Sequence, residues 1–239
     1  MSRHRHYTPK QVRKTLNKHQ RVETDVAVAD DMRLRMVEVK DPYVLLDRMI
    51  SQMERRTQKV ERFPYWAELW PASVALARWL CEADLPPPRE PVLELGCGLG
   101  LVGIALARLG WRVEATDFVE DALVFTSHNA ALNRVTGQHH VGYLDWHNPV
   151  GPACKCMVAA DVLYERKNHP SLRRLLQRML LPGGRFYTSD PGRQPTQRFV
   201  LELKDRGYEH TRHGVDQPWR SQTYSIDIHV FEKPVREGG

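Results

Sequence analysis

The sequence predicts an α/β fold with a mostly parallel sheet that carries helices on both faces. From residue 91 onward, short apolar stretches alternate with stretches of helical periodicity. This alternation is typical of parallel sheets, because each crossover between parallel strands needs a connecting element such as a helix. The stretch 156–160 is continuously apolar, as in a strand buried on both faces. The 239 residues suffice for one such domain with an N-terminal extension.

The region ahead of the sheet is expected to hold a hairpin and two helices. Two β-rich stretches within 22–40 flank Asp30-Asp31, which predicts a hairpin. Apolar periodicity predicts a helix over 43–56, and Pro71 suits the first turn of a second helix. We therefore divide the chain into three parts. They are a basic tail at 1–22, a hairpin and helix at 23–62, and the domain that contains the main sheet at 63–239.

Seven strands and four helices are expected after the Pro-rich break at 86–90. The strands are predicted at 91–95, 111–117, 139–145, 156–164, 185–190, 208–213 and 223–233. The helices are predicted at 101–110, 120–133, 171–180 and 196–207. Gly110 is a typical helix C-terminal signal. The stretch 223–233 alternates in polarity as an antiparallel edge strand would, so the sheet is expected to close with a hairpin.

The positive charge of the chain is concentrated in its tail. The net charge is +6, yet residues 1–22 hold seven Lys and Arg side chains and no acid, so the rest carries 28 basic and 29 acidic residues. Such a tail suits an acidic partner, with nucleic acid possible but not favoured, and a solvated or partly helical arm is the alternative. No apolar run has the length of a membrane span and the first residues lack an apolar signal region, which indicates a cytoplasmic protein, with an organellar matrix possible.

The four cysteines predict neither a disulfide framework nor a metal site. They stand at 81, 97, 154 and 156 in a chain of ordinary length. The pair Cys154 and Cys156 lacks a second Cys/His pair to complete a tetrahedral site. Adjacent His139 and His140 are expected to point to opposite faces of a strand. We expect no metal.

The most informative motif lies between the first strand of the sheet and the following helix. It places an acid and three glycines at alternating positions, namely Glu94, Gly96, Gly98 and Gly100. In open α/β sheets the ligand sits at this edge, and glycines let the backbone approach it closely. Asp117 ends the next strand, where a carboxylate can accept hydrogen bonds from both ribose hydroxyls. The motif therefore predicts a nucleoside-containing cofactor.

Two cofactors fit glycines at this spacing. Gly98, Gly100 and Gly103 also satisfy the dinucleotide-binding fingerprint. Glu94 favours the other cofactor, S-adenosylmethionine (SAM), because its carboxylate attracts the cationic amino-acid end of SAM and repels a pyrophosphate. The sequence thus favours a SAM-dependent methyltransferase over a dehydrogenase, and a Gly-rich turn without a ligand is the remaining alternative.

Two further sites follow the third and fourth strands. Asp145 and Trp146 are placed to meet an adenine. The Asp145 carboxylate can accept a hydrogen bond from the adenine amine, and the Trp146 indole can cover the face of the adenine ring. The alternative for Trp146 is packing at the rim. Asp161 and Tyr164 follow the fourth strand, where Asp161 can orient an amine nucleophile and Tyr164 can pack on it. The alternative for this pair is a helix N-cap and a core tyrosine.

Four segments together resemble the seven-strand, or class I, protein lysine methyltransferases. They are 64–73, 93–107, 144–146 and 159–164. Within that family the chain is most similar to the electron-transfer-flavoprotein β-subunit lysine methyltransferases and their bacterial relatives, which carry an Asp-Pro-Gly-Arg like that at 190–193. The resemblance covers about residues 63–195.

The resemblance implies a role for each matching residue. Trp70 would lie beside the cofactor, the three glycines of the motif would form its loop, Asp117 would hold its ribose and Trp146 would line its adenine pocket. Asp161 and Tyr164 would line a lysine channel. Arg193 would contact the substrate or support the loop. The implied partner is a protein that presents a lysine, and a small molecule or RNA is the alternative substrate.

Overall fold

The computed structural model describes residues 4–54, 63–83 and 85–235. Its main sheet contains all seven expected strands and a short eighth one. These strands are β1 (His4–Arg5), β4 (Val92–Leu95), β5 (Val113–Asp117), β6 (His139–Tyr143), β7 (Cys154–Ala160), β8 (Leu180–Asp190), β9 (Glu209–Trp219) and β10 (Gln222–Glu232). Their order across the sheet is β1-β6-β5-β4-β7-β8-β10-β9. The central strands from β6 to β8 are mutually parallel, so the predicted fold class is confirmed.

The predicted edge position of the last strand is wrong. β10 runs antiparallel to β8 and to β9, and it lies between them, so β9 forms the edge. Alternating polarity reports that a strand has two unlike faces. An interior antiparallel strand has this property as readily as an edge strand does, and the pattern alone cannot separate the two.

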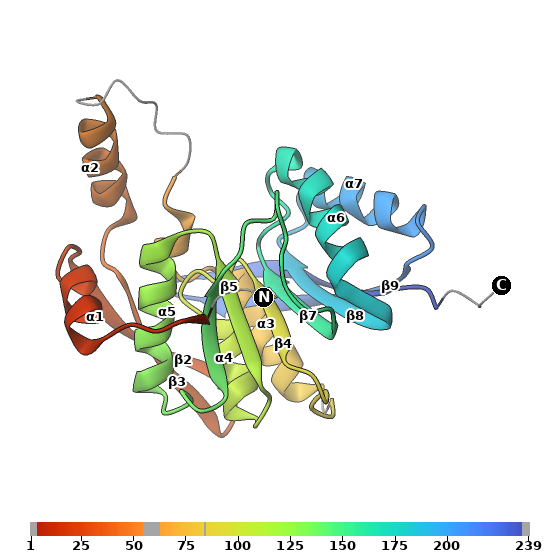
Figure 1. The fold of residues 1–239 in the computed structure, drawn as a ribbon, viewed down its shortest axis with the longest axis horizontal. Helices are drawn as coiled ribbons and strands as arrows, with labels where there is room; N and C mark the ends of the chain where they lie inside the picture. The colour runs from red at the N-terminus through yellow and green to blue at the C-terminus, as the bar shows by residue number, and fades with distance from the viewer. Residues whose placement is uncertain (1–3, 55–62, 84, 236–239) are drawn as a thin grey trace.

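Helices cover both faces of the sheet, as Figure 1 shows. One face carries α3 (Pro71–Glu82), α4 (Leu101–Arg108) and α5 (Glu120–Leu132), and the other carries α6 (His169–Met179) and α7 (Gln194–Lys204). Pro71 occupies the first turn of α3. His139 is buried and His140 exposed, which confirms that the two rings leave β6 on opposite faces. None of the helices in the described part of the chain has the length and apolar content of a membrane crossing.

The predicted N-terminal hairpin forms a separate two-stranded sheet. It consists of β2 (Arg21–Ala29) and β3 (Met32–Val39). Val26, Val28, Leu34 and Met36 are buried, and they belong to the same apolar cluster as α3, α4 and α5. The hairpin therefore packs on the body of the molecule. α2 (Pro42–Glu54) follows it where a helix was predicted over 43–56, and the rest of the predicted 23–62 segment lies outside the described residues.

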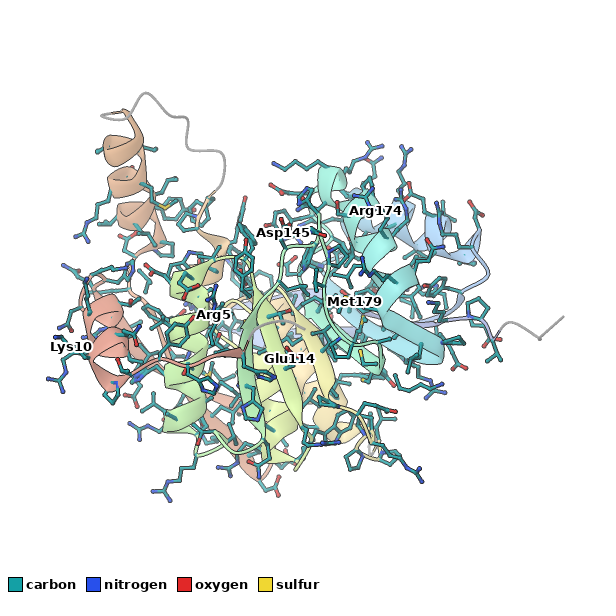
Figure 2. All side chains as sticks on the ribbon, viewed as in Figure 1. Arg5, Lys10, Glu114, Asp145, Arg174 and Met179 are labelled. Atoms are coloured by element: carbon teal, nitrogen blue, oxygen red, sulfur yellow. The ribbon has the colours of Figure 1, made fainter. Side chains whose placement is uncertain are left out.

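The basic tail is not a solvated arm over the residues that the structure describes. β1 pairs with β6 at the edge of the main sheet, and α1 (Pro9–Leu16) lies beside α5. The Thr8 side chain caps α1, and Leu16 at its end is buried. Figure 2 shows Lys10 on the outer side of α1, far from Asp145. The tail is thus partly helical and docked, with Arg5 and Lys18 paired to acids of α5 and the cations of α1 exposed.

Candidate functional site

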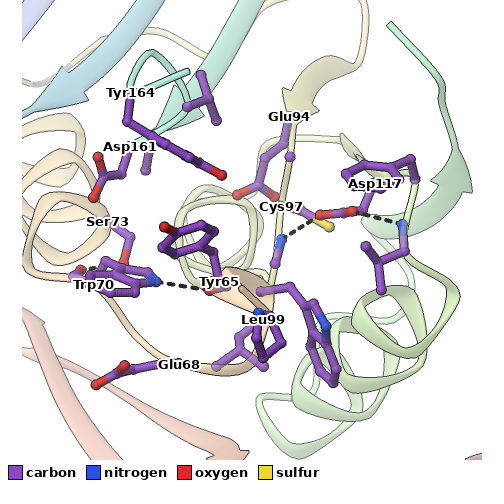
Figure 3. Close-up of a pocket in the computed structure, with 18 of the residues that line it drawn as sticks. Tyr65, Glu68, Trp70, Ser73, Glu94, Cys97, Leu99, Asp117, Asp161 and Tyr164 are labelled. Carbon is purple, nitrogen blue, oxygen red and sulfur yellow. Dashed lines mark hydrogen bonds between the residues drawn. The ribbon is translucent and has the colours of Figure 1, made fainter. Parts of the chain in front are cut away.

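A cavity of about 750 Å³ opens at the carboxyl ends of the central strands. Its walls come from the segment ahead of α3, the glycine loop after β4, and the loops after β5, β6, β7 and β8. Ten of the eleven predicted site residues line it, namely Trp70, Glu94, Gly96, Gly98, Asp117, Asp145, Trp146, Asp161, Tyr164 and Arg193. The exception is Gly100, which ends the loop at the N-cap of α4 and faces Thr126 of α5. Figure 3 shows Asp161 and Tyr164 on one side of the cavity and Asp117 on the other.

The glycine loop needs its glycines for two reasons. Gly96, Gly98 and Gly100 all have positive φ, at 64°, 54° and 83°, a region that side chains other than that of glycine enter at a cost. A β-carbon at Gly100 would also stand 2.5 Å from Thr126 Cγ2 of α5. Gly100 therefore allows the loop to pack closely on α5.

Glu94 lies buried in β4 below the loop and reaches the cavity. Its Oε2 has no hydrogen-bond partner among the described residues. Burial raises the pKa of Glu94 to about 8, against the opposing effect of the nearby Gly103 N–H. Oε2 faces Gly103 of α4 in the packed interior, while the Glu94 side chain as a whole reaches the cavity wall, where a carboxylate would attract a cationic ligand group.

Asp117 is held by backbone groups at the end of β5. Its Oδ2 accepts from the Gly98 N–H at 3.1 Å and its Oδ1 accepts from the Val119 N–H at 2.9 Å. Burial raises the pKa of Asp117 above its ordinary value, and these N–H groups oppose the shift. The same contacts tie the glycine loop to the β5 loop and fix the carboxylate at the cavity wall.

Asp145 and Trp146 occupy the loop after β6. The Asp145 carboxylate accepts from the His147 N–H at 2.9 Å and lies 3.0 Å from His147 Nδ1, and its side chain is 44% exposed. Trp146 is half-buried, and a β-carbon on Gly96 would stand 3.4 Å from its ring. The indole therefore lies against the glycine loop rather than on the outer rim.

Asp161 does not cap a helix, because the two helices that follow, the 3-10 helix Arg166–Asn168 and α6, have Glu165 and Asn168 at their N-caps. It has a positive φ of 54° and pairs with the Arg193 guanidinium through two N–H groups. Arg193 also donates to Asp190 from its backbone N–H at 2.6 Å and from Nη1 at 3.2 Å. Burial raises the pKa of Asp161 although Arg193 opposes this. Arg193 thus braces Asp161 from the loop after β8.

The structure adds aromatic residues that the sequence analysis did not assign. Tyr65 lies next to Tyr164, with ring centroids 4.9 Å apart, and its carbonyl accepts from Trp70 Nε1 at 2.9 Å. Phe63, Trp66 and Phe118 also line the cavity. A usable signal was present, since 63–70 holds four aromatic residues in eight positions.

The cavity fits SAM by the chemistry of its walls. SAM carries an ammonium and a sulfonium cation beside an adenosine. The cavity offers two buried acidic side chains, Glu94 and Asp117. The loop that would meet the ligand exposes backbone and no bulky side chains at Gly96 and Gly98. A pyrophosphate would meet the Asp117 carboxylate with like charge, whereas a cationic ligand group would favour the charged form of Glu94.

A family model described as lysine methyltransferase matches residues 58–205. The chain belongs to this family. It is 31% identical over 167 residues to the protein N-lysine methyltransferase METTL21A of Danio rerio, which covers 64% of this chain and 73% of that protein. It is 42% identical over 74 residues to the electron transfer flavoprotein beta subunit lysine methyltransferase of Danio rerio, across 30% of this chain and 28% of that one. The resemblance seen in the sequence is confirmed.

The fold also matches solved methyltransferase structures. One is the magnesium protoporphyrin IX methyltransferase of Synechocystis PCC 6803 with bound SAM, at a TM-score of 0.51 and 17% identity, across 81% of this chain and 97% of that one. At this identity the match shows the class I methyltransferase fold alone. With the family match, it establishes this lysine methyltransferase family member as a SAM-dependent enzyme.

Proposed function

We propose that this enzyme transfers methyl groups from SAM to lysine side chains of a protein substrate, with the lysine bound beside Asp161 and Tyr164. The observation that carries the proposal is the composition of that end of the cavity. A carboxylate, an opposing guanidinium and two tyrosine rings line one narrow region there, and the glycine loop lies across from it. The family description and the lysine methyltransferase relatives support the same substrate.

The lysine must reach the methyl group as a neutral amine. A free lysine has a pKa of about 10.4, so it arrives as an ammonium ion. An apolar wall disfavours the charged form, and Tyr65 and Tyr164 supply such a wall. Asp161 is placed to accept a hydrogen bond from the amine. Because Arg193 pairs with Asp161 and offsets its charge, the carboxylate stabilises the ammonium form of the lysine less than an unpaired carboxylate would. SAM supplies the methyl group from its sulfonium.

An apolar rim beside this end favours a protein substrate. Aromatic rings run outward from Tyr164 through Tyr65 and Phe63 to Tyr43 of α2, with successive centroids 4.9, 5.0 and 5.2 Å apart. Tyr43 is 69% exposed. A protein whose lysine enters the cavity would cover this row.

Two finer parts of the proposal concern partner and compartment. Lys10, Arg13 and Lys14 are exposed on α1 with no acidic partner among the described residues, which supports an acidic surface on the partner protein. All four cysteines are free, which supports the cytoplasmic location expected from the sequence.

The proposal is tested by incubating the purified enzyme with radiolabelled SAM and a cell lysate, and by digesting matched aliquots with protease and with ribonuclease. We expect label in a protein band that resists ribonuclease and is lost on protease treatment. An Asp161→Ala enzyme should leave that band unlabelled. Label that disappears only with ribonuclease, or that stays in small molecules, would replace the lysine substrate with one of the alternatives.

A further inference from the structure

Two side chains of α5 hold the carbonyl groups of the glycine loop from behind. Thr126 Oγ1 donates to the Gly98 carbonyl at 2.8 Å, and Asn129 Nδ2 donates to the Leu99 carbonyl at 3.0 Å. Both side chains are fully buried. Because a trans peptide is planar, fixing a carbonyl also fixes the N–H on its far side. Thr126 and Asn129 thereby set the direction of the Leu99 and Gly100 N–H groups.

The Asn129 amide also holds the N-terminal hairpin. Its Oδ1 accepts from the Val37 N–H at 2.8 Å, and its Nδ2 donates to the Val37 carbonyl at 3.2 Å. One side chain therefore uses both amide hydrogens and its oxygen to join β3 to the cofactor loop. The hairpin lies at 21–39, outside the family match at 58–205.

A second contact ties the next residue of β3 to the cavity wall. Glu38 is buried and its Oε2 accepts from the Leu69 N–H at 3.1 Å, within the segment that carries Trp70. Arg220, in the turn between β9 and β10, pairs with Glu38 at 3.1 Å and with Glu68 at 2.8 Å. The hairpin thus contacts both the glycine loop and the aromatic wall of the cavity through buried polar groups.

We propose that Asn129 is a positioning residue for the SAM loop and that it couples the loop to the N-terminal hairpin. The loop holds three glycines at positive φ, and glycines lose more conformational freedom on ordering than other residues do, so the ordered loop depends on contacts that hold it. Asn129 supplies such a contact from α5 and joins the loop to β3. Loop order and hairpin docking therefore stabilise each other, and by reciprocity SAM binding stabilises the hairpin.

The chain provides a matched control one helical turn away. Asn133, the C-cap of α5, accepts from the Arg35 N–H at 3.0 Å and donates to the Arg35 carbonyl at 2.8 Å, as Asn129 does with Val37. Its remaining bond goes to the Asn129 carbonyl at 2.8 Å, within α5, and it makes no bond to the glycine loop. Replacing Asn133 removes the same kind of hairpin contact and spares the loop.

The test compares Asn129→Leu with Asn133→Leu in the full-length chain by SAM calorimetry and amide hydrogen exchange. We expect both variants to melt earlier than the wild type. Asn129→Leu should weaken SAM binding roughly tenfold, as the loss of one buried hydrogen bond implies, and Asn133→Leu should leave it within about twofold. Equal weakening in the two variants would overturn the positioning role.

Hydrogen exchange on the wild-type chain tests the coupling without any variant. SAM should slow exchange at the Val37 amide of β3 more than at amides of α7, on the opposite face of the sheet. Thr126→Val should weaken SAM binding and keep this protection of β3, because it removes only the loop contact. If SAM leaves β3 exchange unchanged, the coupling is absent. Since these measurements need SAM binding and no methyl acceptor, they remain decisive even if the lysine substrate is wrong.

Discussion

The two ends of the cavity are built in different ways. The cofactor end comes from neighbouring strands and is formed largely by backbone, with the glycine loop and Asp117 joined through N–H groups. The end that we propose for the lysine is formed by side chains that converge from distant segments, namely Tyr65, Asp161 and Arg193. A backbone site needs particular residues at fixed spacing, whereas a side-chain site needs only that the fold bring them together. The first can therefore be recognised in a sequence more directly than the second.

The carboxylates at the two ends also differ in their partners. Asp117 is surrounded by neutral N–H groups, so it keeps its charge available to a ligand. Asp161 is paired with Arg193, so much of its charge is offset before any substrate arrives. This contrast suits a cofactor site that binds a cation and a substrate site that accepts a neutral amine.

The largest effect that we expect is a loss of methyl transfer without a loss of SAM binding. Asp161→Ala should lower methyl transfer about 10²-fold or more, because the amine loses the group that orients it. The SAM dissociation constant should stay within about threefold of the wild-type value. Calorimetry with SAM and labelled-SAM turnover measure the two effects, with Asp216→Ala on the exposed edge strand as control. Equal loss of binding and transfer would make Asp161 structural and would break the contrast.

A substitution at Asp117 should instead weaken SAM binding at the proposed cofactor end. Asp117→Ala removes a charged acceptor of two backbone N–H groups, and we expect SAM to bind roughly tenfold to a hundredfold more weakly. Calorimetry measures this directly. An unchanged dissociation constant would contradict the assignment of Asp117 to the ribose.

A smaller effect concerns Glu94 and pH. Its pKa of about 8 in the folded chain lies above the ordinary value of 4.5, so the folded state binds this proton more tightly than the unfolded state. The resulting stabilisation is complete below pH 4.5 and is lost as pH rises through 8. Glu94→Gln removes the titration, so without SAM the variant should gain several degrees in Tm relative to the wild type at pH 8 and little at pH 5. A Tm difference between the variant and the wild type that does not change with pH would show that burial does not raise the pKa of Glu94.

The smallest effect lies outside both ends. Lys18 pairs with Asp121 at the start of α5 at 3.0 Å, with half of the Lys18 side chain exposed. Lys18→Ala should lower the free energy of unfolding by about 0.2–1 kcal/mol, and less at high salt. Denaturant unfolding at two salt concentrations measures this. A loss that salt does not reduce would mean that the tail is held by packing and not by charge.

The sequence predicted most of the fold because its elements carry local signals. Periodicity and helix-stop residues located the helices, and the buried run at 156–160 located a central strand. The interior place of β10 was not predictable, since it depends on which strand pairs with β8. The docking of the tail was also missed, because charge alone does not report the capping of α1 by Thr8 or the burial of Leu16.

The candidate site shows the same division. Gly96, Gly98 and Asp117 were found from spacing alone, and the structure brings them together at one edge of the sheet. Tyr65 was missed, although its aromatic neighbours in 63–70 pointed to it, because nothing local says which ring meets Tyr164. Asn129 was missed because it reads as an ordinary helix residue, and only its contacts to Val37 and Leu99 reveal its place.

The most direct test of the account is to identify the residue that receives the methyl group. The protein band labelled by the enzyme and SAM would be hydrolysed to amino acids and the labelled product separated. We expect the label in ε-N-methylated lysine, and none from an Asp161→Ala reaction. Label in methylated arginine, in another amino acid or in a nucleoside would contradict the assignment of the Asp161 and Tyr164 end to lysine.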